Sequence, residues 1–266
     1  MAHTPADVRT SDFAGSVATA ASLNVEQHGF AIVPDVLDAA TVAELCRVVT
    51  AARERENSEN VSNASGTYGL RNLTDVVPKI ADLVRHPRVV ELVSGVLGCG
   101  AFMVRATLFD KTDGANWGVF WHQDLSIAVH QRCEVDGFGA WTRKAGVQCV
   151  QPPTQLMQNV LAVRLHLDDC SAENGALKVL PGTHRLEKLA TADIETQQME
   201  NREVTCEVPS GGAVLMRPLL LHASSPMLKP GSRRVIHFEF ANFDLPEPLQ
   251  WMYRIACQPE AANSSG

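Results

Sequence analysis

The sequence lacks the paired cysteines that mark disulfide-rich or zinc-thiolate proteins. Its seven cysteines are an odd number, lie far apart and form no Cys-x-x-Cys pair. This spacing argues against both a disulfide framework and a thiolate zinc site. We therefore expect a reduced, cytoplasmic protein.

Long apolar runs and clusters of positive charge are also missing. No run approaches the roughly 20 apolar residues that a membrane-spanning helix needs. No basic segment followed by an apolar core marks a signal peptide at the N-terminus. The formal net charge is −7, and Lys and Arg are scattered along the chain. These absences predict a protein that binds neither membranes nor nucleic acid.

The length of 266 residues, of which 45% are hydrophobic, allows one large domain or two small ones. Residues 1–22 are rich in Ala, Ser and Thr and have no strong apolar period, which predicts a flexible N-terminal arm. We expect residues 23–266 to form a single domain. The sequence does not indicate an oligomeric state.

Helical patterns dominate the first hundred residues. The apolar run 30–33 is typical of a short strand. Asp38 or Thr41 can then cap a helix, whose apolar residues recur at helical spacing: Val42, Leu45, Val48 and Ala52. A polar loop is expected at 57–68. A second helix is predicted to begin at Pro87 and to stop at Gly98.

From residue 101 onward, short apolar segments alternate with turn residues. The predicted strands lie near 102–109, 117–122, 158–167, 176–180, 203–208, 213–216 and 233–240. Many short strands without helices between them indicate a sandwich or barrel. Residues 130–155 interrupt this pattern and are long for a strand connection. We interpret them as a candidate lid or substrate loop.

Two distant motifs supply candidate metal ligands. His122 and Asp124 are two residues apart in a strand-like context, so their side chains leave the same face. A second imidazole, His222, follows the apolar run 219–221. Two histidines and one carboxylate on one side of an ion leave three positions open. That pattern is typical of non-haem Fe(II) oxygenases.

An arginine downstream of His222 fits the same chemistry. Arg233 can grip the distal carboxylate of a chelating oxoacid through two parallel hydrogen bonds, and the hydroxyl of Ser224 could donate to it too. The formal charges of Fe(II), Asp124, 2-oxoglutarate and Arg233 then sum to zero, as a buried site requires. Arg234 is the alternative clamp, but strand alternation places only one of the two inside a barrel.

Four stretches together carry a family resemblance. They are Trp-His-Gln-Asp at 121–124, Glu-Asn-Gly-Ala-Leu-Lys-Val-Leu-Pro-Gly-Thr-His at 173–184, His-Ala-Ser-Ser at 222–225, and Arg233. From about Gly29 to Phe243 the chain resembles the phytanoyl-CoA dioxygenase family, whose relatives include ectoine hydroxylase.

The resemblance implies a mainly β fold with flanking helices, built on a double-stranded β-helix, or jelly-roll, core. It implies that Fe(II) is held by His122, Asp124 and His222, and that the cosubstrate 2-oxoglutarate is held by Arg233 and Ser224. Arg164 aligns near a pocket-lining position and is a further candidate for cosubstrate or substrate contact. Because Asp124 is a carboxylate, where related halogenases have a small residue, halogenation is disfavoured.

Other polar residues have simpler structural explanations. His184 is expected to be a turn residue bonded to its own backbone, and His237 a satisfied core histidine. The acidic residues Asp168, Asp169 and Glu173 suit a solvated loop. His166 shares a strand face with Arg164, and Trp117 and Trp121 are most simply core aromatics, although one could wall a pocket. Arg105, in mid-strand, would fit a polar cavity.

The predicted activity is that of an Fe(II)- and 2-oxoglutarate-dependent dioxygenase. It would use O₂ to hydroxylate a C–H bond of a small molecule, with release of succinate and CO₂. Alternatives are a non-oxidative metal-dependent jelly-roll enzyme, against which Arg233 argues, or a catalytically silent binding protein. Desaturation, ring closure and epimerisation would use the same residues. The substrate is not readable, and whether Arg71, Arg105 or the 130–155 segment contacts it stays open.

Overall fold

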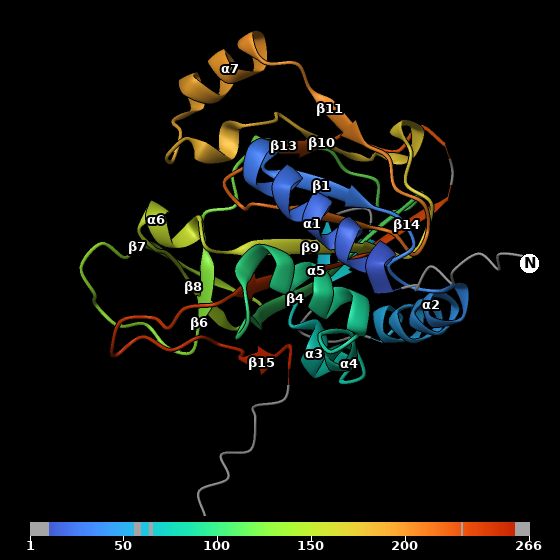
Figure 1. Ribbon diagram of the computed structural model, residues 1–266, viewed down its shortest axis with the longest axis horizontal. Helices are drawn as coiled ribbons and strands as arrows, with labels where there is room; N and C mark the ends of the chain where they lie inside the picture. The colour runs from blue at the N-terminus through green and yellow to red at the C-terminus, as the bar shows by residue number, and fades with distance from the viewer. Residues whose placement is uncertain (1–10, 56–59, 64–65, 230, 259–266) are drawn as a thin grey trace, which may run out of the picture.

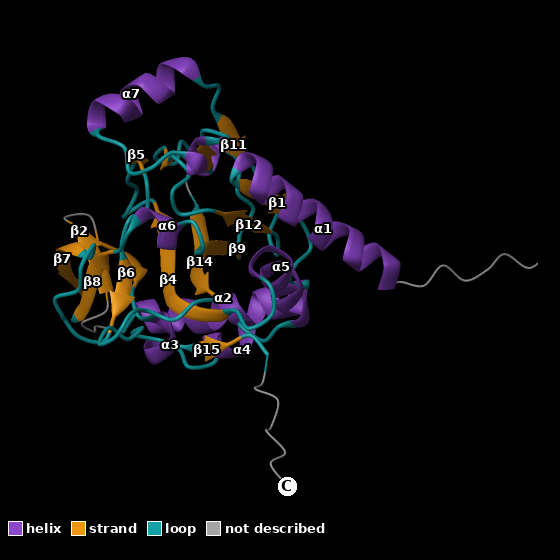
Figure 2. Ribbon diagram, turned by 60° about the vertical axis from the view of Figure 1, so that its left-hand side comes forward, coloured by secondary structure: helices purple, strands orange, loops and turns teal. Residues whose placement is uncertain are grey.

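The computed structural model describes residues 11–55, 60–63, 66–229 and 231–258. The described part is β-rich, with helices gathered on one side of its largest sheet (Figure 1 and Figure 2). This arrangement agrees with the predicted mainly β architecture with flanking helices. None of the described helices is both long and apolar enough to cross a membrane.

The largest sheet is antiparallel throughout and forms the wall of the molecule between helices and site. Its strand order is β1-β12-β9-β14-β4-β3-β2, with β15 beside β4. The bounds are β1 (Phe30–Val33), β12 (Ala213–Met216), β9 (Leu161–His166), β14 (Ser232–Ala241), β4 (Phe102–Thr112), β3 (Gly66–Leu70), β2 (Asn60–Asn63) and β15 (Ile255–Ala256).

A second, shorter antiparallel sheet carries two of the candidate metal ligands. Its order is β11-β10-β13-β5, with β11 (Val204–Cys206), β10 (Leu177–Val179), β13 (His222–Ser224) and β5 (Val119–His122). Side chains of both sheets share one buried cluster, which includes Ala162 and Val214 from the large sheet and Leu177 and Cys206 from the short one. The two sheets therefore pack face to face, as a jelly-roll core requires.

The flanking helices cover the outer face of the large sheet. They are α1 (Ser11–His28), α2 (Ala39–Arg53), α3 (Leu73–Val76), α4 (Ile80–Leu83) and α5 (Pro87–Leu97). Their apolar faces share one buried cluster with β4, β9 and β14. The predicted helix from Pro87 is confirmed, and Gly98 follows it with φ +80°. Asp38, rather than Thr41, caps α2, because its carboxylate accepts a 2.7 Å hydrogen bond from the Thr41 amide.

Helix α1 corrects the predicted N-terminal arm. Residues 11–22 are helical, and the predicted boundary at residue 22 falls inside α1. Ala18 and Ala21 are buried against α5, and the hydroxyl of Ser22 donates a 2.7 Å hydrogen bond to the Gly95 carbonyl. Small residues pack closely and favour helix without producing a strong apolar period. Residues 1–10 lie outside the described residues.

Two predicted loops contain strands instead. The segment expected as a polar loop at 57–68 includes β2 and the start of β3. The 130–155 segment includes β7 (Gly139–Lys144) and β8 (Val147–Gln151), which form a three-stranded sheet with β6 (Ile127–Val129). Side chains of this sheet form a separate apolar cluster with Phe102 and Val104 at the start of β4. The 130–155 segment is therefore largely a hairpin; its role as a lid or substrate element stays a prediction.

Two further helices lie in the connections of the β-rich part. Helix α6 (Thr154–Met157) precedes β9, and α7 (Thr191–Glu200) lies between β10 and β11. Figure 1 shows α7 standing away from the sheets, and none of its residues is buried.

Candidate active site

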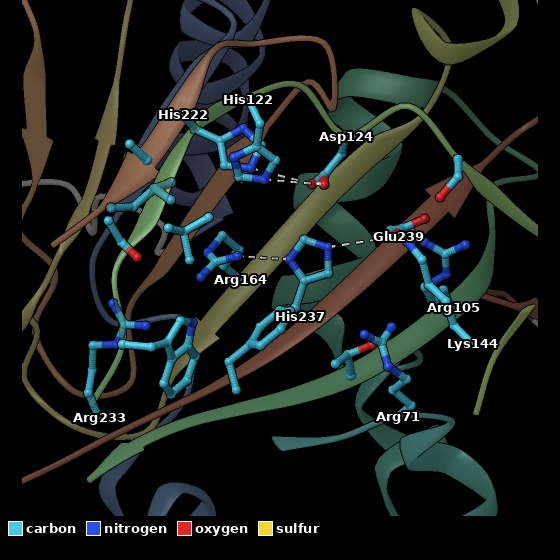
Figure 3. Close-up of a pocket in the computed structure, with 18 residues that line it drawn as sticks. Arg71, Arg105, His122, Asp124, Lys144, Arg164, His222, Arg233, His237 and Glu239 are labelled. Carbon is cyan, nitrogen blue, oxygen red and sulfur yellow. Dashed lines mark hydrogen bonds and ion pairs between the residues drawn. The ribbon is translucent and has the colours of Figure 1, made fainter. Parts of the chain in front are cut away.

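The three predicted metal ligands come together at one end of the short sheet. His122 closes β5, Asp124 follows it, and His222 opens β13 directly opposite His122. The Asp124 carboxylate lies 3.7 Å from Nε2 of His122 and 3.5 Å from Nε2 of His222. Ligand atoms held by one ion at about 2.0–2.2 Å each are no more than about 4.4 Å apart. Both distances satisfy that limit, so the three side chains can share one ion (Figure 3).

Backbone carbonyls fix the direction in which both imidazoles present their free nitrogen. Nδ1 of His122 donates a 2.8 Å hydrogen bond to the Phe120 carbonyl, and Nδ1 of His222 donates one of 2.8 Å to the Leu220 carbonyl. A carbonyl only accepts, so each Nδ1 carries the proton. Each neutral ring then keeps its Nε2 lone pair for a metal, as in metal sites whose histidines are oriented by outer hydrogen bonds.

The electrostatics of the site keep His222 neutral and Asp124 ionised. Burial lowers the pKa of His222 to about 4, against the opposing pull of Asp124. Burial acts to raise the pKa of Asp124, but the nearby His222 and His122 outweigh it and the pKa falls to about 2. Neutral imidazole and ionised carboxylate are the forms that bind metal. Two nitrogens and one carboxylate, with open positions beside them, fit Fe(II).

Gln123, between the ligands, holds their loop in place. It is buried, and its amide nitrogen donates to the carbonyls of Leu219 (3.0 Å) and Glu187 (3.2 Å). Its amide oxygen accepts a 2.9 Å hydrogen bond from the Leu189 backbone. It therefore ties the first ligand strand to the segment before His222. Sequence reasoning assigned Gln123 no role, although its place on the opposite strand face from both ligands was a usable signal.

A cavity of about 230 Å³ opens beside the three ligands. Its wall includes Ser224 and Arg233 at one end, Arg164 and His237 in the middle, and Glu239 and Arg105 toward the other end (Figure 3). The cavity therefore brings together every predicted site residue. The volume suits a small ligand, since pockets for drug-sized molecules start at about 300 Å³.

Alternation along β14 separates the two neighbouring arginines. Arg233 is 2% exposed, lines the cavity, and donates to the Gly175 carbonyl. Arg234 points the other way and pairs with Asp168 at 2.6 Å. Arg233 therefore faces the cavity and Arg234 does not, as strand alternation requires, and the clamp role of Arg233 stays a prediction.

The Gly175 carbonyl, which accepts from Arg233, is positioned by a left-handed backbone conformation that residues other than glycine rarely adopt. Gly175 has φ +75°, and a Cβ built there would lie 2.5 Å from the Ser225 carbonyl oxygen. Only glycine therefore fits this turn without a shift of the backbone.

Lys111 is a site residue that sequence reasoning missed. It lies opposite Arg233 on β4 and is fully buried. Its ammonium donates to the Ser224 hydroxyl at 3.1 Å and to the Ser225 carbonyl at 2.7 Å. Burial, followed by the charges of Arg233 and Arg164, lowers its pKa to about 7. Two cations at one end of the cavity attract an anion there.

A chain of polar contacts crosses the middle of the cavity. Arg164 donates to Nδ1 of His237 at 3.1 Å, so Nε2 of His237 carries the ring proton and faces Glu239 at 3.7 Å. Glu239 also pairs with Arg105 at 2.9 Å. His237 is buried and hydrogen-bonded, as expected of a satisfied core histidine, but it also lines the cavity. Arg105 does face a polar cavity, as its mid-strand position suggested.

The remaining polar candidates lie outside the ligand cluster, and most of them make structural contacts. Nε2 of His184 donates to the Glu26 carbonyl at 3.1 Å, so it ties its turn to α1 rather than to its own backbone. Asp169 accepts from the Ser210 amide, and Glu173 pairs with Lys229. His166 is buried, and neither ring nitrogen has a hydrogen-bond partner among the described residues. Trp117 lines the cavity, which fits the pocket-wall alternative.

Comparison with known proteins agrees with this geometry. The sequence pattern of the family described as "Phytanoyl-CoA dioxygenase (PhyH)" matches residues 25–235. L-proline trans-4-hydroxylase from Streptomyces griseoviridis is 23% identical over 235 residues, covering 77% of this chain and 79% of the relative.

Solved structures share the fold at low identity. The epimerase SnoN, in complex with Fe3+, alpha ketoglutarate and nogalamycin RO, superposes with a TM-score of 0.66 at 17% identity, covering 91% of this chain and 95% of that one. EctD from S. alaskensis, with 2-oxoglutarate and 5-hydroxyectoine, has a TM-score of 0.65 at 16% identity, covering 83% and 74%. Both likenesses support the predicted double-stranded β-helix. With its family pattern, this fold and the His–Asp–His cluster, the chain belongs to the phytanoyl-CoA dioxygenase family of Fe(II)- and 2-oxoglutarate-dependent dioxygenases.

Proposed function

We propose that this enzyme hydroxylates a C–H bond of a small molecule, with release of succinate and CO₂. The observation that carries the proposal is the pairing of two features in one cavity. One is the ligand cluster with both Nε2 atoms free, and the other is Arg233 buried at the cavity end. A metal hydrolase would need the first feature but has no use for an oxoacid clamp.

His122, Asp124 and His222 would hold Fe(II), and the distal carboxylate of 2-oxoglutarate would lie against Arg233. Ser224, Lys111 and Arg164 are placed to add hydrogen bonds or positive charge to the cosubstrate. When bound, the iron supplies activation of O₂ coupled to oxidative decarboxylation of 2-oxoglutarate. The protein contributes orientation, because an Arg–carboxylate pair fixes the cosubstrate with two parallel hydrogen bonds.

The relatives support the reaction class. One is named as a proline hydroxylase and one as an ectoine dioxygenase, so a hydroxylated small molecule is the product class we favour. The cavity of about 230 Å³ supports a substrate smaller than an acyl-CoA. All seven cysteines are free, which supports a cytoplasmic location.

A titration of 2-oxoglutarate into Fe(II)-loaded protein without oxygen tests the proposal. The metal-to-ligand charge-transfer band should saturate in the wild type. Breaking one side of a buried, hydrogen-bonded charge pair typically costs about 3–5 kcal/mol, so Arg233→Ala should weaken binding by roughly two to three and a half decades. Arg233→Lys should recover part of this, because an ammonium lacks the two-pronged contact.

Arg234→Ala is the matched control, since Arg234 faces Asp168 and not the cavity. It should leave the band unchanged. If Arg234→Ala weakens the band and Arg233→Ala does not, the clamp belongs to Arg234. If neither variant changes it, the oxoacid assignment is wrong. In a separate experiment under oxygen, a compound that raises succinate release by the wild type would identify the substrate.

A further inference from the structure

The cavity carries more positive charge than iron and its cosubstrate require. Its wall has two carboxylates, Asp124 and Glu239, and five cations, which are Arg71, Arg105, Lys144, Arg164 and Arg233. Under the proposed function, Fe(II), Asp124, 2-oxoglutarate and Arg233 balance one another. Four cations and only one carboxylate therefore remain to face another ligand. Three of these cations, Arg71, Arg105 and Arg164, are buried or half-buried, and like charges placed so are costly unless an opposite charge joins them.

The strand register places this surplus mostly at the end away from Arg233. On the paired strands β4 and β14, Lys111 lies opposite Arg233, Thr107 opposite His237, and Arg105 opposite Glu239. Six residues of extended strand, from Arg105 to Lys111, span roughly 20 Å. A single five-carbon dicarboxylate cannot reach both ends. The cavity thus has a cosubstrate end and a second cationic end, with the metal ligands between them (Figure 3).

Two cations at the second end have no counter-ion in the part of the chain that the structure describes. Arg105 is neutralised by Glu239 at 2.9 Å. Arg71, just after β3, and Lys144, the last residue of β7, make no hydrogen bond or ion pair with any described residue. Arg71 is half-buried and Lys144 exposed. A smaller hollow of about 20 Å³ is lined by both of them together with Arg105. Figure 3 shows both on the far side of His237 from Arg233.

We propose that Arg71 and Lys144 bind an oxyanion group of the substrate, a carboxylate or a phosphate. This inference rests on the proposed function and names the substrate class of the same site. The planar guanidinium grips such a group with two hydrogen bonds, and the lysine adds a flexible point charge. Held there, the rest of a small substrate extends toward the metal ligands. Lys144 would bring the 130–155 hairpin into substrate binding.

Small oxyanions are the probes for this site. Full-length protein is loaded with Fe(II) and 2-oxoglutarate without oxygen, so that the Arg233 end is filled. Its thermal unfolding midpoint is followed against acetate or methyl phosphate, with chloride at matched ionic strength as the reference. We expect saturable stabilisation beyond that of chloride. The anion that saturates at the lower concentration identifies carboxylate or phosphate as the preferred group.

Variants at the two cations decide where the probe binds. The double variant Arg71→Gln/Lys144→Gln should bind the probe more weakly, with an apparent dissociation constant raised roughly tenfold or more. Arg143→Gln is the matched control, because Arg143 neighbours Lys144 but donates to the Gly146 carbonyl at the exposed hairpin turn. It should bind the probe as the wild type does. No stabilisation beyond chloride, or equal stabilisation in the double variant, would overturn the proposal.

The same measurement on metal-free Arg233→Ala protein separates this proposal from the proposed function. That protein lacks both the iron and the buried Arg233 guanidinium, so a probe effect that Arg71→Gln/Lys144→Gln abolishes in this background reports the Arg71 and Lys144 end alone. If Fe(II)-loaded wild type shows no charge-transfer band with 2-oxoglutarate but the probe effect is intact, only the oxygenase assignment is contradicted. An intact band with no probe effect would contradict the oxyanion site only.

Discussion

At the scale of single residues, each metal ligand depends on a neighbour that sets its chemistry. The carbonyls of Phe120 and Leu220 fix the imidazole tautomers, and the two histidines keep Asp124 ionised. Such outer contacts commonly change metal affinity by 10–100-fold. The ligands themselves should matter at least as much.

Removal of one imidazole should therefore release the metal. His122→Ala should lower Fe(II) affinity at least roughly tenfold and abolish turnover, because two ligands remain of three. Competition against a chromophoric chelator measures the affinity. His130→Ala, at an exposed histidine beyond β6, is the control and should bind iron normally. Wild-type iron content in His122→Ala would remove this residue from the ligand set.

Gln123 should contribute to stability and not to iron ligation. Gln123→Ala leaves two carbonyls and one amide without their buried partner, and each such loss costs about 1–3 kcal/mol. Urea unfolding should show a clear drop in free energy, whereas Gln198→Ala, on the exposed face of α7, should be near neutral. A stable Gln123→Ala protein would show that the 187–189 segment does not depend on this side chain.

The sequence predicted the ligands and Arg233 because their spacing follows from strand alternation and a recognisable motif. It did not predict that His237 and Glu239 line the cavity or that Lys111 is buried against Ser224 in its wall. Each of them lies in a strand that also carries apolar core residues, and a polar residue in such a strand is equally compatible with a satisfied core position. Only the pairing of β14 with β4 and β9 decides that they face a common space.

At the scale of elements, the apolar strands were predictable and the polar ones were not. Segments such as 102–109 and 233–240 are rich in Val, Leu, Phe and Met, and they form β4 and β14. The hairpins β2–β3 and β7–β8 have little alternation of apolar and polar residues. Their strands are therefore stabilised by pairing with neighbouring strands and could not be predicted from the local sequence pattern. Helix α1 escaped prediction because alanine gives helix without a strong apolar stripe.

Truncation tests the corrected start of the folded part. Deleting residues 1–22 removes most of α1, including buried Ala18 and Ala21 and the Ser22 contact to Gly95. It should lower the thermal unfolding midpoint by several degrees, since exposing the α5 face costs on the order of a few kcal/mol. Deleting residues 1–10, which precede α1, is the control and should have a smaller effect. Equal unfolding midpoints for the two deletions would instead support the original prediction that residues 1–22 form a flexible arm.

At the scale of the whole molecule, the sign of the net charge is opposite to the sign of the charge that lines the cavity. The chain carries a formal net charge of −7, whereas the charged residues of the cavity wall are mostly cations, five against two carboxylates. Composition alone therefore predicts nothing about the sign of the ligand. A cavity of one sign with apolar walls raises the local concentration of oppositely charged small molecules. Overall charge underlies the predicted lack of nucleic-acid binding, and local charge underlies the proposed binding of anionic ligands.

The buried cation Lys111 should also make the stability of the whole metal-free protein depend on pH. Its pKa is about 7 in the folded protein and 10.5 in an unfolded chain. Between these values the unfolded state binds more protons, so the free energy of unfolding rises with pH. Below about pH 7 the lysine is charged in both states, and the full cost of burial persists. Above 10.5 the lysine is neutral in both states.

Lys111→Met isolates this contribution, because methionine fills a similar space without the charge. Chemical denaturation of both proteins from about pH 7 to about pH 8, below the ordinary cysteine pKa of about 8.5, gives the comparison. The variant should be the more stable protein at pH 7. The wild type should gain on it by roughly 1 kcal/mol per pH unit. A constant difference across this range would show that Lys111 stays charged when buried, stabilised by Ser224 and the Ser225 carbonyl.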